Sequence, residues 1–339
     1  MATATQKSAL NVVIGAMTFG ASGKGGARVH DIKDVEAILD AFRAHGHTEI
    51  DTARTYAGGT SEEYLGQIDL LAKGFKIETK LSPRKNVEDP ITHDAEGLKR
   101  HLFKSLKALN VKSLEMWYLH APDHTVPYEI TFKAVNDLYK EGYFKRLGIS
   151  NYSSWEVAEI VGICRNNGYI QPTAYQGIYN AIHRTVEPEL FPCLRKFGIS
   201  FYEFNPLGGG FFTGRYNSIN DAPEEGSRFD PNKTQGKVLE RALLQSAGRN
   251  SCRSWRHSLT LTEVTLRWIS HHSLLKREYG DAVLIGTSSL KHIEDNLVDL
   301  EKGPLPEDVV EALNNAWLGA QQYASKYYRD SPYVRSSVA

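Results

Sequence analysis

Four side chains suited to proton transfer occur between positions 51 and 120 of the sequence. Asp51, Lys80 and His120 each stand at the carboxyl end of a separate short apolar segment. Tyr56 follows the first of these segments by a few residues. Parallel sheets place their chemistry at the carboxyl ends of the strands, so these side chains would share one rim. The combination predicts an enzyme.

The expected chemistry is donation of a proton to an oxyanion. Tyrosine is a poor acid at neutral pH because its pKa is about 10, but a nearby ammonium favours the phenolate. Lys80 could supply that charge, with Asp51 holding its head group, and His120 could orient a substrate oxygen. Singly, each residue is more often a turn, surface or structural residue. Together they indicate a site that needs a hydride donor to create the oxyanion.

Apolar segments and amphipathic helices alternate along the chain, which predicts eight strand–helix units and a last helix. The predicted strands are 10–17, 48–51, 76–80, 116–120, 144–150, 173–176, 199–205 and 282–286. The predicted helices are 31–45, 61–68, 94–109, 128–141, 154–166, 187–197, 260–271, 288–300 and 306–328. This order is typical of a (β/α)8 TIM barrel. We expect a single domain over 10–328, a disordered N-terminal segment 1–9 and a tail 329–339.

A doubly wound sheet is the alternative architecture. Its dinucleotide-binding form requires GxGxxG between the first strand and its helix. The glycine-rich segment 20–26 fits neither that motif nor a P-loop, and Gly208-Gly209-Gly210 follows the seventh strand instead. The barrel is therefore favoured.

Composition excludes several classes of partner. Forty basic residues balance forty acidic ones in 339 residues, so no net charge attracts nucleic acid or an anionic membrane. The three cysteines lack CxxC spacing and suit a reducing compartment. No signal peptide or membrane-spanning run is evident. We expect a soluble cytoplasmic protein.

Several segments resemble the aldo-keto reductases, and most closely the branch of the aflatoxin-aldehyde reductases. The resemblance extends from about residue 10 to residue 328. Its most specific part is Asp-Thr-Ala-x-x-Tyr at 51–56, followed by Thr-Lys at 79–80 and Leu-His at 119–120. Supporting segments are 15–20, 118–123, 147–152, 205–207 and 286–290.

The resemblance implies a barrel that binds NADPH in an extended form without a Rossmann domain. It implies Tyr56 as the proton donor, with Lys80 and Asp51 tuning it and His120 orienting the carbonyl group. Three further residues match the positions that hold the nicotinamide carboxamide: Ser150, Asn151 and Gln176. The family branch also suggests a homodimer.

The cofactor's phosphates need donors and positive charge, which barrels commonly supply from the loops after strands seven and eight. The candidate cofactor-binding residues near strand seven are Phe204, on the nicotinamide side, and Asn205, Leu207, Gly209, Arg215 and Arg228. The candidates near strand eight are Gly286, Ser288, His292 and Asn296.

Three features depart from the family pattern. Phe204 occupies a position where relatives usually place tyrosine or tryptophan against the nicotinamide, and phenylalanine can still stack. Glu203 should point toward the helix layer, where a carboxylate needs a partner that the sequence does not reveal. The basic stretch 248–258 is expected to be a surface loop, with a contribution to the cofactor's 2′-phosphate as the alternative.

The favoured function is NADPH-dependent reduction of a small-molecule aldehyde or ketone, in natural-product metabolism or in aldehyde detoxification. The alternative is a cofactor-binding auxiliary subunit similar to those of potassium channels, which share the fold and the four residues. A barrel hydrolase with paired carboxylates is disfavoured, because Asp51 and Asp123 are the only candidate acids at the rim. Metal catalysis is also disfavoured, since there is no HExxH motif.

Overall fold

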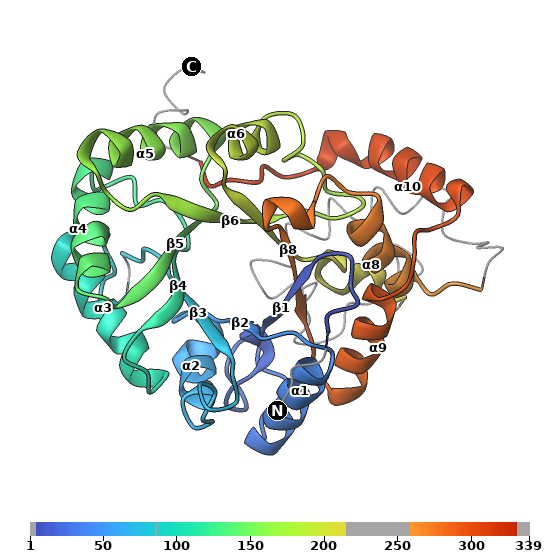
Figure 1. Ribbon diagram of the computed structural model, residues 1–339, viewed down its shortest axis with the longest axis horizontal. Coiled ribbons are helices and arrows are strands. Elements are labelled where there is room, and N and C mark those ends of the chain that lie inside the picture. The colour runs from blue at the N-terminus through green and yellow to red at the C-terminus, as the bar shows by residue number, and fades with distance from the viewer. Residues whose placement is uncertain (1–4, 86, 215–257, 331–339) are drawn as a thin grey trace.

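The computed structural model describes residues 5–85, 87–214 and 258–330. Eight parallel strands pair in chain order, and β1 pairs with β8 to close a barrel. Figure 1 shows these strands as an inner ring surrounded by helices. The predicted (β/α)8 barrel is confirmed. The strands are β1 (Asn11–Gly15), β2 (Glu49–Asp51), β3 (Lys76–Leu81), β4 (Leu114–Leu119), β5 (Phe144–Ser150), β6 (Pro172–Ile178), β7 (Ser200–Phe204) and β8 (Ala282–Gly286).

Several helices begin at polar residues that cap their free backbone N–H groups. Asp31 accepts from Lys33 N, Asp94 accepts from Gly97 N, and Ser153 forms a capping box with Glu156. The helices are α1 (Ile32–Ala44), α2 (Thr60–Leu65), α3 (Ala95–Ala108), α4 (Tyr128–Lys140), α5 (Ser154–Asn167), α6 (Leu190–Phe197), α8 (Leu261–His271), α9 (Leu290–Leu300) and α10 (Glu307–Ala320).

Strand alternation divides the buried side chains between two layers. The larger layer lies between the strands and the helices, where apolar helix faces such as that of Leu98 and Leu102 are buried. A smaller cluster contains alternate residues of the strands: Val13, Met116, Tyr118, Ala174, Tyr202, Ala282 and Leu284. These residues fill the barrel interior, on the face that also carries Asp51, Lys80 and Gln176.

Three predicted helix bounds were wrong. The last helix was expected to reach Tyr328, but α10 ends at Ala320 and a 3₁₀ turn, η5 (Gln321–Tyr323), follows it. Beyond that turn the chain returns to the barrel, where Ser154 N donates to Tyr327 OH at 3.2 Å and Arg329 N donates to Asn151 O at 3.0 Å. The helix expected from 187 begins at Leu190, and the short helix expected to reach 68 ends at Leu65.

The described part of the chain contains no helix that is long and apolar enough to cross a membrane. The predicted disorder of the N-terminal segment concerns residues 1–9, of which 1–4 lie outside the described residues. Ser8 is buried, and its carbonyl accepts from Arg277 Nη2 at 2.7 Å. The proposed domain bounds, 10–328, stay a prediction.

Candidate active site

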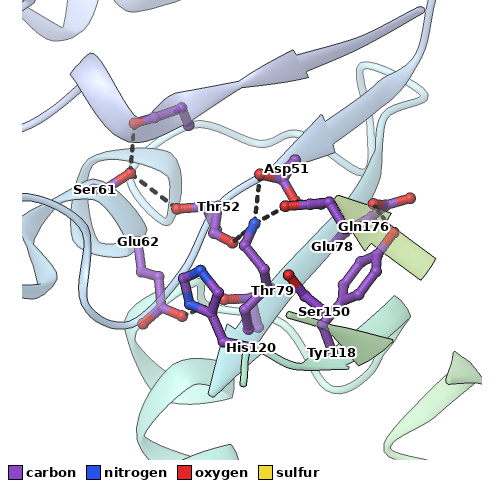
Figure 2. Close-up of polar contacts among 12 residues, drawn as sticks. Asp51, Thr52, Ser61, Glu62, Glu78, Thr79, Tyr118, His120, Ser150 and Gln176 are labelled. Carbon is purple, nitrogen blue, oxygen red and sulfur yellow. Dashed lines mark hydrogen bonds and ion pairs between the residues drawn. The ribbon is translucent and has the colours of Figure 1, made fainter. Parts of the chain in front are cut away.

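A buried ion pair lies at the carboxyl ends of β2 and β3. Both carboxylate oxygens of Asp51 accept hydrogen bonds from Lys80 Nζ, and the Thr52 carbonyl accepts a third at 2.9 Å. Gln176 Nε2 donates to Asp51 Oδ1 at 2.8 Å from across the barrel. Asp51, Thr52 and Gln176 converge on this point in Figure 2. Lys80 has no exposed surface, so its three donors are held in one geometry.

Tyr56 lies over this ion pair, on the 3₁₀ turn η2 (Tyr56–Gly59) that follows β2. Its ring centroid is 5.0 Å from Lys80 Nζ, so the phenol lies beside that ammonium. The His120 ring meets the Tyr56 ring edge-on, with centroids 5.9 Å apart. Tyr56 is half-buried, whereas Lys80 beneath it is fully buried. The structure therefore brings the four predicted catalytic residues together.

The turn that carries Tyr56 has left-handed backbone at three successive residues. Ala57, Gly58 and Gly59 have φ values of 47°, 64° and 98°. A Cβ at Gly59 would lie 2.6 Å from Arg54 Nη2, so glycine leaves room for the guanidinium. Arg54 in turn donates to the buried Glu62 Oε2 at 2.9 Å. This contact fastens α2 to the turn.

Charge and burial set the protonation of the site. Burial by itself lowers the pKa of Lys80, but the electrostatic interactions with Asp51 and with Tyr56 outweigh it, so the pKa is raised and the ammonium persists. Burial lowers the pKa of His120 well below its ordinary value, and the charges of Lys80, Arg329 and Arg84 lower it further. The imidazole is therefore neutral near pH 7.

The three residues predicted to hold a carboxamide lie beside the ion pair. Ser150 and Gln176 are buried. Asn151 has φ of 65°, a left-handed conformation that asparagine tolerates, and its Nδ2 donates to His120 O at 2.8 Å and to Ser150 Oγ at 2.9 Å. Gln176 has one amide proton committed to Asp51. Gln176 thus contacts Asp51, and Asn151 contacts both the His120 backbone and Ser150.

The predicted cofactor contacts after β7 form a tight glycine-rich turn. Phe204 packs against the interior cluster, and Asn205 has φ of 76°. Leu207 precedes the 3₁₀ turn η3 (Gly208–Thr213), within which Gly209 has φ of 73°. Arg215, Arg228 and most of the stretch 248–258 lie outside the described residues.

The predicted contacts after β8 gather at the start of α9. Gly286 ends β8 opposite Gly15, and its backbone is exposed. Ser288 Oγ and His292 Nδ1 are 3.0 Å apart, and Asn296 is buried farther along the helix. Together with the free N–H groups of the helix, these side chains fit a phosphate-bearing ligand.

Other residues at the site were not predicted. Glu78 and Tyr118 lie inside the barrel next to the ion pair, and strand alternation from Lys80 and His120 could have indicated them. The Thr52 carbonyl and Glu62 gave no such signal, because their roles depend on tertiary contacts.

Glu203 is buried, as expected of a residue that faces the helices. Neither carboxylate oxygen has a hydrogen-bond partner in the described part of the chain, and burial raises the pKa of this carboxyl well above its usual range. Separately, residues 5–85, 87–214 and 258–330 contain no cluster of three potential metal ligands.

Comparison with known proteins identifies the family. The Aldo/keto reductase family pattern matches residues 11–318. An aldo-keto reductase of Pseudocercospora fijiensis is 47% identical over 86% of this chain and all of that protein. The aldo-keto reductase pigE of Monascus ruber is 41% identical over 97% of this chain and all of its own length. Aflatoxin B1 aldehyde reductase member 2 of Homo sapiens is 41% identical, over 86% of this chain and 84% of that protein. This chain therefore belongs to the aldo/keto reductase family, in the branch of the aflatoxin-aldehyde reductases, and is an oxidoreductase that acts on carbonyl groups.

Proposed function

We propose that the protein reduces a small aldehyde or ketone with NADPH and that Tyr56 donates the proton. The observation that carries this proposal is the position of the Tyr56 phenol, whose ring centroid lies 5.0 Å from the Lys80 ammonium that Asp51 holds in place. The positive charge favours the phenolate that forms when the carbonyl oxygen takes the proton. NADPH, when bound, supplies the hydride for the carbonyl carbon.

His120 would orient the carbonyl group. A neutral imidazole can donate an N–H hydrogen bond to the oxygen while Tyr56 gives up its proton. The ring stands edge-on to Tyr56, and the Asn151 amide holds the backbone carbonyl of His120. Both donors would then converge on one oxygen atom.

The chain offers a matching place for the cofactor. Ser150, Asn151 and Gln176 would hold the nicotinamide carboxamide, and Phe204 would stack on the ring. The turn at Gly209 and the start of α9 at Ser288 would bind the phosphates. We also propose a cytoplasmic location, from the composition, and a homodimer, which sedimentation of the purified protein would test.

The decisive test is Tyr56→Phe, assayed for NADPH oxidation with 4-nitrobenzaldehyde. Loss of the proton donor should lower kcat by at least about 10²-fold while NADPH affinity stays within a few fold. Tyr64→Phe is the matched control, because Tyr64 lies nearby on α2 and its hydroxyl donates to His30 O at 3.2 Å. A folded Tyr56→Phe protein with the parental rate would exclude Tyr56 as the donor.

A further inference from the structure

A second carboxyl group lies inside the barrel beside the ion pair. Glu78 is two residues before Lys80 in β3, so both side chains point into the interior. Glu78 pairs with Asp51 in the register of β2 and β3. It is 0% exposed, and the function proposed above does not use it.

The surroundings of Glu78 suit an uncharged carboxyl. Tyr118 OH donates to Oε2 at 3.3 Å, and Figure 2 shows the Tyr118 hydroxyl directed toward the Glu78 carboxyl. Oε1 is buried and has no hydrogen-bond partner among the described residues. A buried carboxylate needs donors for both oxygens, whereas a protonated carboxyl needs fewer.

Two carboxylates on the neighbouring strand β2 act in the same direction. Burial raises the pKa of Glu78 well above its usual range, the carboxylates of Glu49 and Asp51 raise it further, and Arg146 lowers it. Arg146 Nη1 donates to Tyr202 OH at 3.2 Å, which in turn donates to Glu49 at 3.2 Å. The nearest ammonium, that of Lys80, is bonded to Asp51. Lys76 at the start of β3 is half-exposed and lies 3.6 Å from Glu49.

Tyr118 links this carboxyl to the catalytic cation. Its ring centroid is 5.8 Å from Lys80 Nζ. Across the ring lies Gly148, where a Cβ would come within 2.2 Å of a ring carbon, so the absence of a side chain makes room for Tyr118. The ring is therefore fixed between Lys80 and the Glu78 carboxyl.

We propose that Glu78 is a positioning residue for carbonyl reduction and that the site works while Glu78 keeps its proton. With Glu78 uncharged, the Lys80 ammonium has one adjacent carboxylate, Asp51, and can favour the Tyr56 phenolate. When the Glu78 proton leaves to solvent, a second carboxylate disfavours that phenolate, so Tyr56 releases its proton to the substrate less readily. This role of Glu78 rests on the proposed function of Tyr56.

The first test is the pH profile of kcat for 4-nitrobenzaldehyde reduction at saturating NADPH. Glu78→Gln copies the uncharged carboxyl, so its kcat should lie within about threefold of wild type near pH 7. On the alkaline side of the wild-type profile, where wild-type kcat falls, it should exceed wild type by at least about threefold, because the variant cannot acquire the opposing charge. A folded variant whose profile coincides with wild type, or which is already inactive near pH 7, would overturn the proposal.

Glu203→Gln is the matched control for this profile. Glu203 is equally buried and also has a raised pKa, but it lies on the face of β7 that packs against the helices. Its replacement should leave the wild-type profile of kcat unchanged. An equal alkaline gain in Glu203→Gln would show that the effect is not specific to the interior carboxyl, and would also overturn the proposal.

The second test needs neither turnover nor Tyr56. A protonated carboxyl has an infrared carbonyl stretch that a carboxylate lacks, so the difference between wild type and Glu78→Gln near pH 7 should contain that band. If Glu78→Gln does not fold, Glu203→Gln is used instead, because the carbonyl band that it retains would come from Glu78. That band should shift in the double variant Glu203→Gln/Tyr118→Phe, which loses the hydrogen bond from Tyr118 to Glu78 Oε2. Absence of the band or of its shift refutes a protonated Glu78. A band present in a protein whose Tyr56→Phe variant is fully active would instead refute only the proposed function.

Discussion

Among single residues, Asp51 joins two other strands at the site, because it binds Lys80 of β3 through both oxygens and also Gln176 of β6. Asp51→Asn removes the charge that keeps the buried Lys80 protonated. We expect kcat to fall by about 10²-fold with NADPH affinity nearly unchanged, since the site then favours the Tyr56 phenolate less. Steady-state kinetics and cofactor fluorescence titration measure the two quantities.

Asp40→Asn is the control for Asp51→Asn. Asp40 also pairs with a lysine, Lys73, but on the surface at 3.1 Å. Exposed pairs contribute little, so this variant should keep its rate. A fully active Asp51→Asn protein would show that the ion pair does not tune Tyr56.

Residue types and order were sufficient to predict that Asp51, Tyr56, Lys80 and His120 meet. They were not sufficient to predict the bond from Gln176 to Asp51, which joins β2 to β6 across the closed barrel. That contact depends on how the interior side chains fill the barrel, which no local pattern encodes. The roles of these residues in turnover stay predictions until variants are measured.

Among the elements, α2 and the turn before it determine where Tyr56 lies. Glu62 is buried and accepts from Arg54 and, at 2.7 Å, from Thr79 Oγ1 of β3. Glu62→Ala leaves both donors unpaired and frees the turn, so we expect a loss of about 3 kcal/mol in stability and about tenfold in kcat. Urea unfolding and steady-state kinetics would measure these losses.

Asp137→Asn is the control for this element, because Asp137 pairs with Lys133 four residues away on the exposed face of α4. Asp137→Asn should change neither the free energy of unfolding nor kcat by a measurable amount. If Glu62→Ala lost stability while kcat stayed at the wild-type value, α2 would be structural only and would not position Tyr56.

The element pattern was predictable where burial follows sequence periodicity, as in the eight strands. It failed at the end of the last helix, where aromatic residues continue a helical spacing as far as Tyr328. Tyr327 instead packs against the start of α5, where Ser154 N donates to its hydroxyl. Tertiary contacts override local propensity there, and a single sequence does not show them.

For the whole molecule, buried titratable groups make stability depend on pH. His47 is 0% exposed, and burial is the main cause that lowers its pKa to about 4. The unfolded chain binds this proton below its ordinary pKa of about 6.5, so the histidine's contribution to stability falls as the pH drops from about 6.5 to about 4. His47→Asn should reduce the pH dependence of urea unfolding in that window by up to about 1.4 kcal/mol per pH unit, whereas His30→Asn, at an exposed position, should not.

Glu203 should have the opposite effect over an overlapping pH range. Burial raises its folded pKa well above the value of about 4.3 for an unfolded glutamate. Between these two values the folded protein holds one more proton than the unfolded chain, so stability falls as the pH rises.

Glu203→Gln removes this titration without changing the shape of the side chain much. Relative to wild type, its free energy of unfolding should therefore rise from pH 4 toward pH 7, by about 1 to 3 kcal/mol. Urea unfolding at both pH values measures the change, and a difference between the two proteins that stays constant with pH would mean that Glu203 is ionised in the folded state and has a partner.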